Sequence, residues 1–245
     1  NIKSAIGKPK VVIEDSKKRW ADSVKVLVNS LYEGQNVYFN YDFIRKEGAR
    51  LMTMGGRASG PQPLIKLHDF IREIMHSAQG RKLTTLEAHD ICNQIAEIVV
   101  VGGVRRSSQI SLSDLNDEMM RHAKDWPYPI KRAMANNSAI YREHPTAAEF
   151  LREWAALALS GTGERGIFNL QAAQNRAPTR RYAPLIQGTN PCGEIMLRDM
   201  EFCNLSEVVV REDDDLDSLL DKVETATWIG VLQSTFTRFP YLRDG

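Results

Sequence analysis

Helical and extended patterns alternate along this chain of 245 residues, and the alternation constrains its fold more than any other feature. Apolar residues that recur three or four positions apart predict helices, and short alternating or β-branched runs predict strands. The predicted helices are 15–32, 64–76, 84–101, 147–159 and 216–236, and the predicted strands are 109–113, 139–141, 166–170 and 201–210. Helices that alternate with short strands are typical of an α/β fold.

Three of these helices carry further signals. Asp15 or Ser16 caps the first helix, and Thr84 and Glu87 have the spacing of a capping box. Cys92 has apolar neighbours in the helix that begins at Thr84, so we interpret it as a structural cysteine. In the helix 147–159 we expect the apolar face to point inward: Phe150, Leu151, Trp154, Leu157 and Ala158.

Composition and charge exclude several classes of protein. Hydrophobic residues make up 42% of the chain and charged residues 26%, as in an ordinary globular domain. A net charge of +1 gives no argument for a surface that binds nucleic acid, and the longest apolar run, 98–101, is far too short to cross a membrane. Three cysteines and five scattered histidines lack metal-binding spacing. We therefore expect no metal site and neither a nucleic acid nor a membrane as partner.

The run Asn190-Pro191-Cys192-Gly193-Glu194 places a thiol between an amide and a carboxylate. Proline and glycine favour a sharp turn, which would present these side chains from the tip of a loop. A second cysteine, Cys203, follows eleven positions after Cys192 (203 − 192). Taken alone, Cys192 also fits a small buried residue in a turn, and Cys203 also fits the core of a strand.

A second segment is rich in hydrogen-bond donors. Two glycines follow a helix, and two arginines and two serines come next, so the loop is flexible and suits a nucleotide base or phosphate. Its main residues are Gly102, Gly103, Arg105 and Arg106. A helix end with a solvated basic turn is the alternative. The glycine-rich run 161–166 lacks the lysine of a phosphate-binding loop, so we interpret it as a helix-to-strand connection.

The run from Asn190 to Glu194, followed by Phe202-Cys203-Asn204-Leu205, resembles the radical-cysteine loop of ribonucleotide reductases. The spacing is most similar to the monomeric, adenosylcobalamin-dependent ribonucleoside-triphosphate reductases. The resemblance implies a ten-stranded α/β barrel with the radical cysteine on a central finger loop. Because such enzymes are much longer and this chain begins at Asn1, we expect 1–245 to be a partial catalytic barrel domain of a longer reductase.

The resemblance also implies roles for single residues. Cys192 would carry the thiyl radical, Glu194 would act as the base, and Asn190 would position the ribose hydroxyls. Cys203 would be one member of the redox pair, and its partner is expected upstream of Asn1, because Cys92 does not lie in a matching context. Gly102, Gly103, Arg105 and Arg106 would belong to the loop that relays effector binding to the substrate base.

The implied reaction is the reduction of ribonucleoside triphosphates to deoxyribonucleoside triphosphates with adenosylcobalamin as cofactor. The expected partners are the triphosphate substrate, a deoxynucleotide effector and a thioredoxin-like reductant, and the expected location is cytoplasmic. The segment by itself is expected to be inactive. Two alternatives remain open at this point. One is a diphosphate reductase of another class with a separate radical-generating subunit, and the other is a catalytically incomplete nucleotide-binding fragment.

Overall fold

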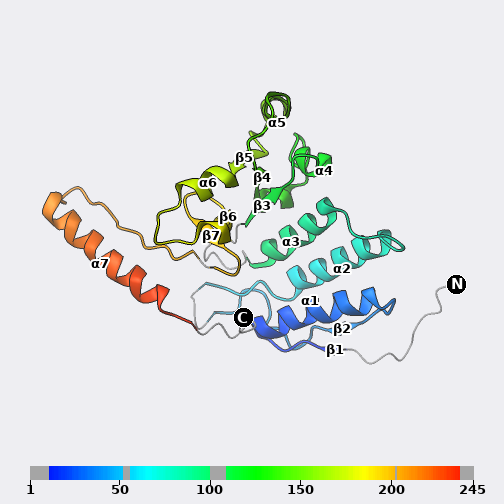
Figure 1. Ribbon diagram of the computed structural model, residues 1–245. Helices are drawn as coiled ribbons and strands as arrows, with labels where there is room; N and C mark the ends of the chain where they lie inside the picture. The colour runs from blue at the N-terminus through cyan, green and yellow to red at the C-terminus, as the bar shows by residue number, and fades with distance from the viewer. Residues whose placement is uncertain (1–10, 52–55, 100–108, 202, 238–245) are drawn as a thin grey trace.

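A computed structural model of the chain describes residues 11–51, 56–99, 109–201 and 203–237 (Figure 1). The elements in chain order are β1 (Val11–Val12), α1 (Lys17–Tyr32), β2 (Phe39–Asn40), α2 (Gln62–Ser77), α3 (Thr85–Val99), β3 (Gln109–Ser113), α4 (Glu118–Arg121), η1 (Ile130–Met134), β4 (Ala135–Tyr141), α5 (Ala147–Leu159), β5 (Gly166–Asn169), α6 (Leu170–Arg176), η2 (Ala183–Leu185), β6 (Ile186–Thr189), β7 (Met196–Arg198) and α7 (Leu216–Ser234).

The first three helices lie side by side and form one apolar layer, at the lower right of Figure 1. Strands β1 and β2 are parallel and are joined through α1. The layer buries Ile13, Leu27, Phe39, Ile44, Leu64, Leu67 and Ile71. The predicted helix starts are confirmed: Ser16 accepts from the backbone N–H of Arg19, and Thr84 and Glu87 exchange the two hydrogen bonds of a capping box.

Above this layer lies a three-stranded sheet in the order β3-β4-β5. Both strand pairs are parallel, with Ile110 opposite Asn136 and Ala139 opposite Ile167. Helix α5 makes the crossover from β4 to β5, and 160–165 forms the helix-to-strand connection that the sequence predicts. The α/β prediction is confirmed. Within the described residues the strands form sheets of two or three, and no closed barrel is seen.

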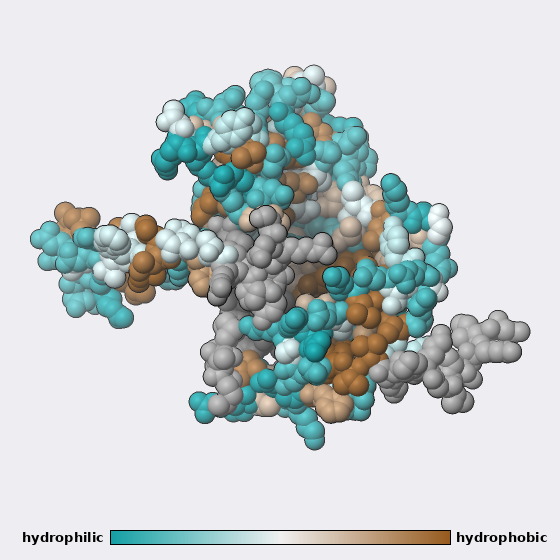
Figure 2. All heavy atoms as spheres, turned by 60° about the horizontal axis from the view of Figure 1, so that its bottom comes forward, coloured by the Kyte–Doolittle hydropathy of each residue, from teal (hydrophilic) through white to brown (hydrophobic). Residues whose placement is uncertain are grey.

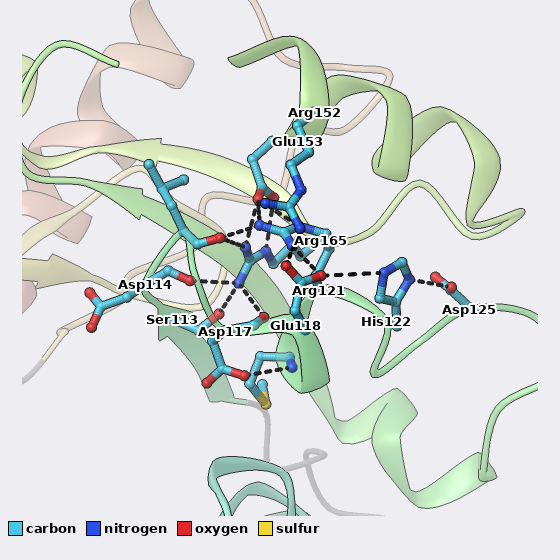
Figure 3. Close-up of polar contacts among 12 residues, drawn as sticks. Ser113, Asp114, Asp117, Glu118, Arg121, His122, Asp125, Arg152, Glu153 and Arg165 are labelled. Atoms are coloured by element: carbon cyan, nitrogen blue, oxygen red, sulfur yellow. Dashed lines mark hydrogen bonds and ion pairs between the residues drawn. The ribbon is translucent and has the colours of Figure 1, made fainter. Parts of the chain in front are cut away.

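Helix α5 has the predicted bounds, but the prediction of its buried face is wrong. Phe150, Leu151 and Trp154 are exposed, and the helix turns Glu153 inward instead. Figure 3 shows Arg121 and Arg165 converging on this carboxylate, with Arg121 Nε 2.7 Å and Arg165 Nη2 2.8 Å from Glu153 Oε1. A buried carboxylate requires such partners, so two distant arginines, and not helical periodicity, decide which face of α5 is buried.

The two arginines also favour the ionised form of Glu153. Burial by itself raises the pKa of Glu153, but the hydrogen bonds from Arg165 and Arg121 outweigh burial and hold the pKa below its ordinary value. Arg165 also donates to Ser113 Oγ at the end of β3. The cluster therefore fixes α4 and α5 to the end of β3 and to the residue that precedes β5.

After the sheet, β6 and β7 form an antiparallel hairpin. Its stem packs on the sheet through a small apolar cluster of Ile140, Leu170 and Ile186, with Leu112 and Met196 beside it. A Cβ at Gly188 would lie 3.2 Å from Leu112 Cδ1, so glycine permits the close approach of β6 to β3. The hairpin thus holds 190–195 at the edge of the central sheet.

The predicted strand 201–210 is wrong, since the described residues 203–210 have no regular secondary structure. Val209 and Val210 are exposed, and among the described strands none pairs with this segment. Helix α7 follows the predicted pattern and is capped by Asp215. It projects from the body with apolar side chains on its surface, at the left of Figure 2. In the part of the chain that the structure describes, no helix is both long and apolar enough to span a bilayer.

Candidate active site

The loop between β6 and β7 is organised by the side chain of Asn190, which is 4% exposed. Its Oδ1 accepts hydrogen bonds from the backbone N–H of Gly193 at 3.2 Å and of Ile195 at 3.0 Å. Gly193 has a φ of +89°, a conformation that side chains other than glycine's rarely adopt. The asparagine and the glycine together close a tight loop with Cys192 exposed at its tip.

The side chain of Asn190 also contacts two further predicted site residues, Glu194 and Cys203. Its Nδ2 donates to Glu194 Oε1 at 2.6 Å and lies 3.8 Å from Cys203 Sγ. One amide therefore contacts a carboxylate and a thiol, and a second thiol, Cys192, stands on the same loop. The structure brings Asn190, Glu194 and Cys203 together.

Cys203 reaches Asn190 from an irregular segment and not from a strand, so the predicted setting of this cysteine is wrong. The chain turns back after β7 through residues 198–201, where Met200 has a left-handed φ of 59°. Glu201 holds this turn by accepting from the Arg198 backbone N–H and from Arg181. Burial raises the pKa of Glu201, yet its hydrogen bonds and the two arginines keep the pKa below the ordinary value.

The structure corrects the placement of Cys92, which is exposed on α3 and not buried. The face of α3 that meets β4 is polar, while its isoleucines pack toward α1 and α2. His89 and Asn93 are buried there, and His89 Nε2 lies 3.0 Å from Asn137 Oδ1 in β4. Among the described residues, no group of three or more His, Cys, Asp or Glu side chains is arranged to hold a metal ion.

Gly102, Gly103, Arg105 and Arg106 lie outside the described residues. The two ends of their segment are described: α3 ends at Val99, and β3 begins at Gln109. Gln109 Nε2 donates to Asn93 Oδ1 at 2.6 Å, which ties the start of β3 to α3. The segment 100–108 therefore starts and ends on elements that a buried polar network joins to β4.

Sequence reasoning missed Asn136, which contacts the loop from the central sheet. Its Nδ2 donates to the backbone carbonyl of Pro191 at 2.7 Å. A signal was present, because Asn136 and Asn137 are consecutive, and asparagine is depleted in strands. Two asparagines inside a central strand are therefore candidates for specific hydrogen bonds.

Comparison with known proteins agrees with this geometry. The family model described as "Ribonucleotide reductase, barrel domain" matches residues 129–229, a range that contains β4, the whole hairpin and Cys203. The adenosylcobalamin-dependent ribonucleoside-triphosphate reductase of Lacticaseibacillus paracasei is 39% identical in an alignment of 173 positions that covers 67% of this chain and 22% of that relative. The chain belongs to the ribonucleotide reductase family.

Other relatives in this family carry the same name. The enzyme of Lactobacillus delbrueckii subsp. bulgaricus is 32% identical in an alignment of 235 positions that covers 83% of this chain and 30% of the relative. That of Lactobacillus leichmannii is 35% identical in an alignment of 190 positions that covers 71% of this chain and 24% of the relative. The chain thus spans between 22% and 30% of the length of these three reductases.

Proposed function

We propose that this chain is part of a catalytic barrel that reduces ribonucleoside triphosphates to deoxyribonucleoside triphosphates. The single observation that carries the proposal is the convergence of Glu194 and Cys203 on the amide of Asn190, next to the exposed Cys192. The names of the relatives support a triphosphate substrate and adenosylcobalamin as cofactor. The finer architecture belongs to the proposal as well: residues 1–245 form part of a ten-stranded barrel, and the loop 190–195 is its central finger.

In the proposed reaction, a thiyl radical at Cys192 takes the hydrogen atom from C3′ of the ribose. A C–H bond breaks, an S–H bond forms, and the radical moves to the sugar. Glu194 accepts the proton of the 3′-hydroxyl, while Asn190 orients both the carboxylate and the ribose hydroxyls. The 2.6 Å bond between Asn190 and Glu194 supports this division of roles.

The reduction then needs two electrons, which we assign to Cys203 and a second cysteine. The pair gives up two hydrogen atoms: one leaves with the 2′-hydroxyl as water, the other ends on C2′, and a disulfide forms. Glu194 returns its proton to the 3′ oxygen, and Cys192 returns its hydrogen atom to C3′ and is again a thiyl. Neither Cys92, exposed on α3, nor Cys192 suits the second thiol, so we assign that role to a cysteine outside these 245 residues. A thioredoxin-like dithiol would reduce the disulfide.

The exposed thiol of Cys192 fits a radical cofactor that must approach it from outside the chain. When bound, adenosylcobalamin supplies the radical that removes a hydrogen atom from a thiol. The chain's own contribution is to hold Cys192 at the tip of a tight loop, through the hydrogen bonds from Gly193 and Ile195 to Asn190 Oδ1.

We also propose that Gly102, Gly103, Arg105 and Arg106 form the specificity loop, through which a bound deoxynucleotide effector selects the substrate base. Support comes from the described ends of the segment. Gln109 and Asn93 join β3 to α3, and His89 of α3 contacts Asn137 of β4, next to Asn136 at the hairpin. These hydrogen bonds would connect a conformational change in the segment 100–108 to the loop 190–195.

The proposed function is tested by product formation in a full-length reductase that carries this segment, supplied with adenosylcobalamin, a ribonucleoside triphosphate and a dithiol. We expect Cys192→Ala to abolish formation of the deoxynucleotide. Cys92→Ala is the matched control, since Cys92 is exposed on α3, and it should leave the rate unchanged. Deoxynucleotide formation by the Cys192→Ala enzyme would contradict the proposal.

A further inference from the structure

The tip of the β6–β7 hairpin is held from outside by one side chain of the central sheet. Asn136 Nδ2 donates to the Pro191 carbonyl at 2.7 Å. That carbonyl belongs to the peptide unit that joins Pro191 to Cys192. A peptide unit is planar and rigid, so fixing its oxygen also fixes the direction in which the Cys192 Cα leaves the loop.

Asn136 is mounted on a rigid support. It lies in β4, the central strand of the sheet, and pairs in register with Ile110 of β3. Its neighbour Asn137 is 2% exposed, points to the opposite face, and bonds to His89 through its side chain and to Glu164 through its backbone N–H. These bonds anchor the strand at the position from which Asn136 reaches the loop.

The loop itself needs this support. The hydrogen bonds to Asn190 Oδ1 fix the internal shape of the loop but not its orientation relative to the sheet. The apolar contacts of the hairpin, through Ile186, Gly188 and Met196, lie at the stem. Asn136 acts at the tip, next to Cys192, where a small rotation moves the sulfur most.

We propose that Asn136 is a positioning residue for the reaction: its amide sets the orientation of Cys192 for hydrogen-atom transfer. This inference rests on the proposed function, because it presumes that Cys192 reacts. Reacting atoms must be held within a fraction of an ångström, and a misplacement of about 1 Å can lower a rate on the order of 100-fold. Asn136 touches neither the sulfur nor the substrate in this account, and it acts through the Pro191–Cys192 peptide.

The test compares three variants in a full-length reductase that carries this segment. Asn136→Asp keeps the shape of the side chain but replaces the N–H donor with a carboxylate oxygen, and Asn136→Gln keeps the donor on a longer arm. Ser138→Ala, two positions along the same strand and on the same face, is the matched control. We expect Asn136→Asp to lower kcat about ten- to a hundredfold with little change in KM. Asn136→Gln should recover part of kcat, and Ser138→Ala should retain it.

A second readout uses the 245-residue chain itself and needs no cofactor. We expect the rate at which iodoacetamide alkylates Cys192 to change about two- to tenfold in Asn136→Asp, the factor that corresponds to one ordinary hydrogen bond. The rate at Cys92, exposed on α3, serves as the internal reference and should stay constant.

The outcomes separate this inference from the proposed function. Unchanged kcat and unchanged Cys192 alkylation in Asn136→Asp would overturn the positioning role, while a dead Cys192→Ala enzyme would leave the proposed function standing. Turnover by Cys192→Ala would overturn the function itself. A loss of kcat in Asn136→Asp that merely follows a smaller folded fraction, or that Asn136→Gln does not relieve at all, would also contradict the positioning role.

Discussion

The layer of α1, α2 and α3 and the β6–β7 hairpin are held together by different interactions. In the layer, Leu27, Leu64, Leu67 and Ile71 are completely buried, and each stabilises the fold by roughly 1.5 to 3 kcal/mol. At the tip of the hairpin, the Asn190 side chain accepts hydrogen bonds from the loop backbone and Asn136 donates one to it, while Cys192 and Glu194 remain exposed. The difference teaches that changes in the layer should affect folding, whereas changes in the hairpin tip should affect chemistry.

The largest effect on stability is expected in the layer. We expect Leu67→Ala to lower the free energy of unfolding by about 2 to 5 kcal/mol, because it removes buried methyl groups and leaves a cavity. Lys66→Ala, at the exposed neighbouring position of the same helix, is the control and should change stability by less than about 0.5 kcal/mol. Denaturant unfolding followed by circular dichroism measures both. Equal losses in the two variants would mean that the layer is not the core.

The layer should also show a dependence on pH through His68. This ring is completely buried between Ser23 and Tyr41, and burial, together with the charge of Arg72, lowers its pKa to about 4. Below pH 6.5 His68 is protonated in the unfolded chain but stays neutral in the folded chain until the pH approaches 4. The free energy of unfolding therefore falls as the pH falls. We expect a loss of about 2 kcal/mol between pH 7.5 and pH 5.

The control for this pH effect is His68→Gln, which removes the titrating group. Its stability should be lower at pH 7.5 but should change less between pH 7.5 and pH 5. An identical pH dependence in both proteins would show that His68 is not the group responsible.

The hairpin should behave in the opposite way. We expect Asn190→Ala to lower the free energy of unfolding by about 1 to 3 kcal/mol, because it removes the hydrogen bonds to Gly193, Glu194 and Ile195, each of which contributes about 1 kcal/mol or less where water reaches the loop. Turnover in a full-length reductase should nevertheless be lost, because Glu194 and Cys203 lose the amide between them. Asn204→Ala, at an exposed position near Cys203, is the control and should retain turnover. Retained turnover in Asn190→Ala would break the distinction between the two regions.

The sequence predicted those parts of the fold whose signals are local. The caps at Ser16 and Thr84 and the strand β3 depend on neighbouring residues, and the structure contains all three. Predictions failed where distant partners decide the outcome. Two arginines turn Glu153 of α5 inward, and 203–210 has a strand-like composition but no partner strand among the described residues.

In the candidate site, too, local contacts could be predicted from the sequence and contacts with distant residues could not. The motif from Asn190 to Glu194 is local, and a tight loop brings its amide and carboxylate together, whereas the contact from Asn190 to Cys203 depends on the path of the chain after β7. The contact from Asn136 to Pro191 spans 55 positions and depends on the packing of the hairpin against β4. A contact between residues so far apart in the sequence cannot be predicted from a local sequence pattern.

The central claim is that Cys192 starts the reaction and Cys203 supplies reducing power, and electron paramagnetic resonance tests it most directly. A full-length reductase is mixed rapidly with adenosylcobalamin and a nucleotide, and the thiyl signal is recorded. We predict that Cys203→Ser still gives the signal but no deoxynucleotide, and that Cys192→Ser gives neither, because a serine O–H bond is much too strong to replace the S–H bond. A thiyl signal in the Cys192→Ser enzyme, or its absence in Cys203→Ser, would contradict the account.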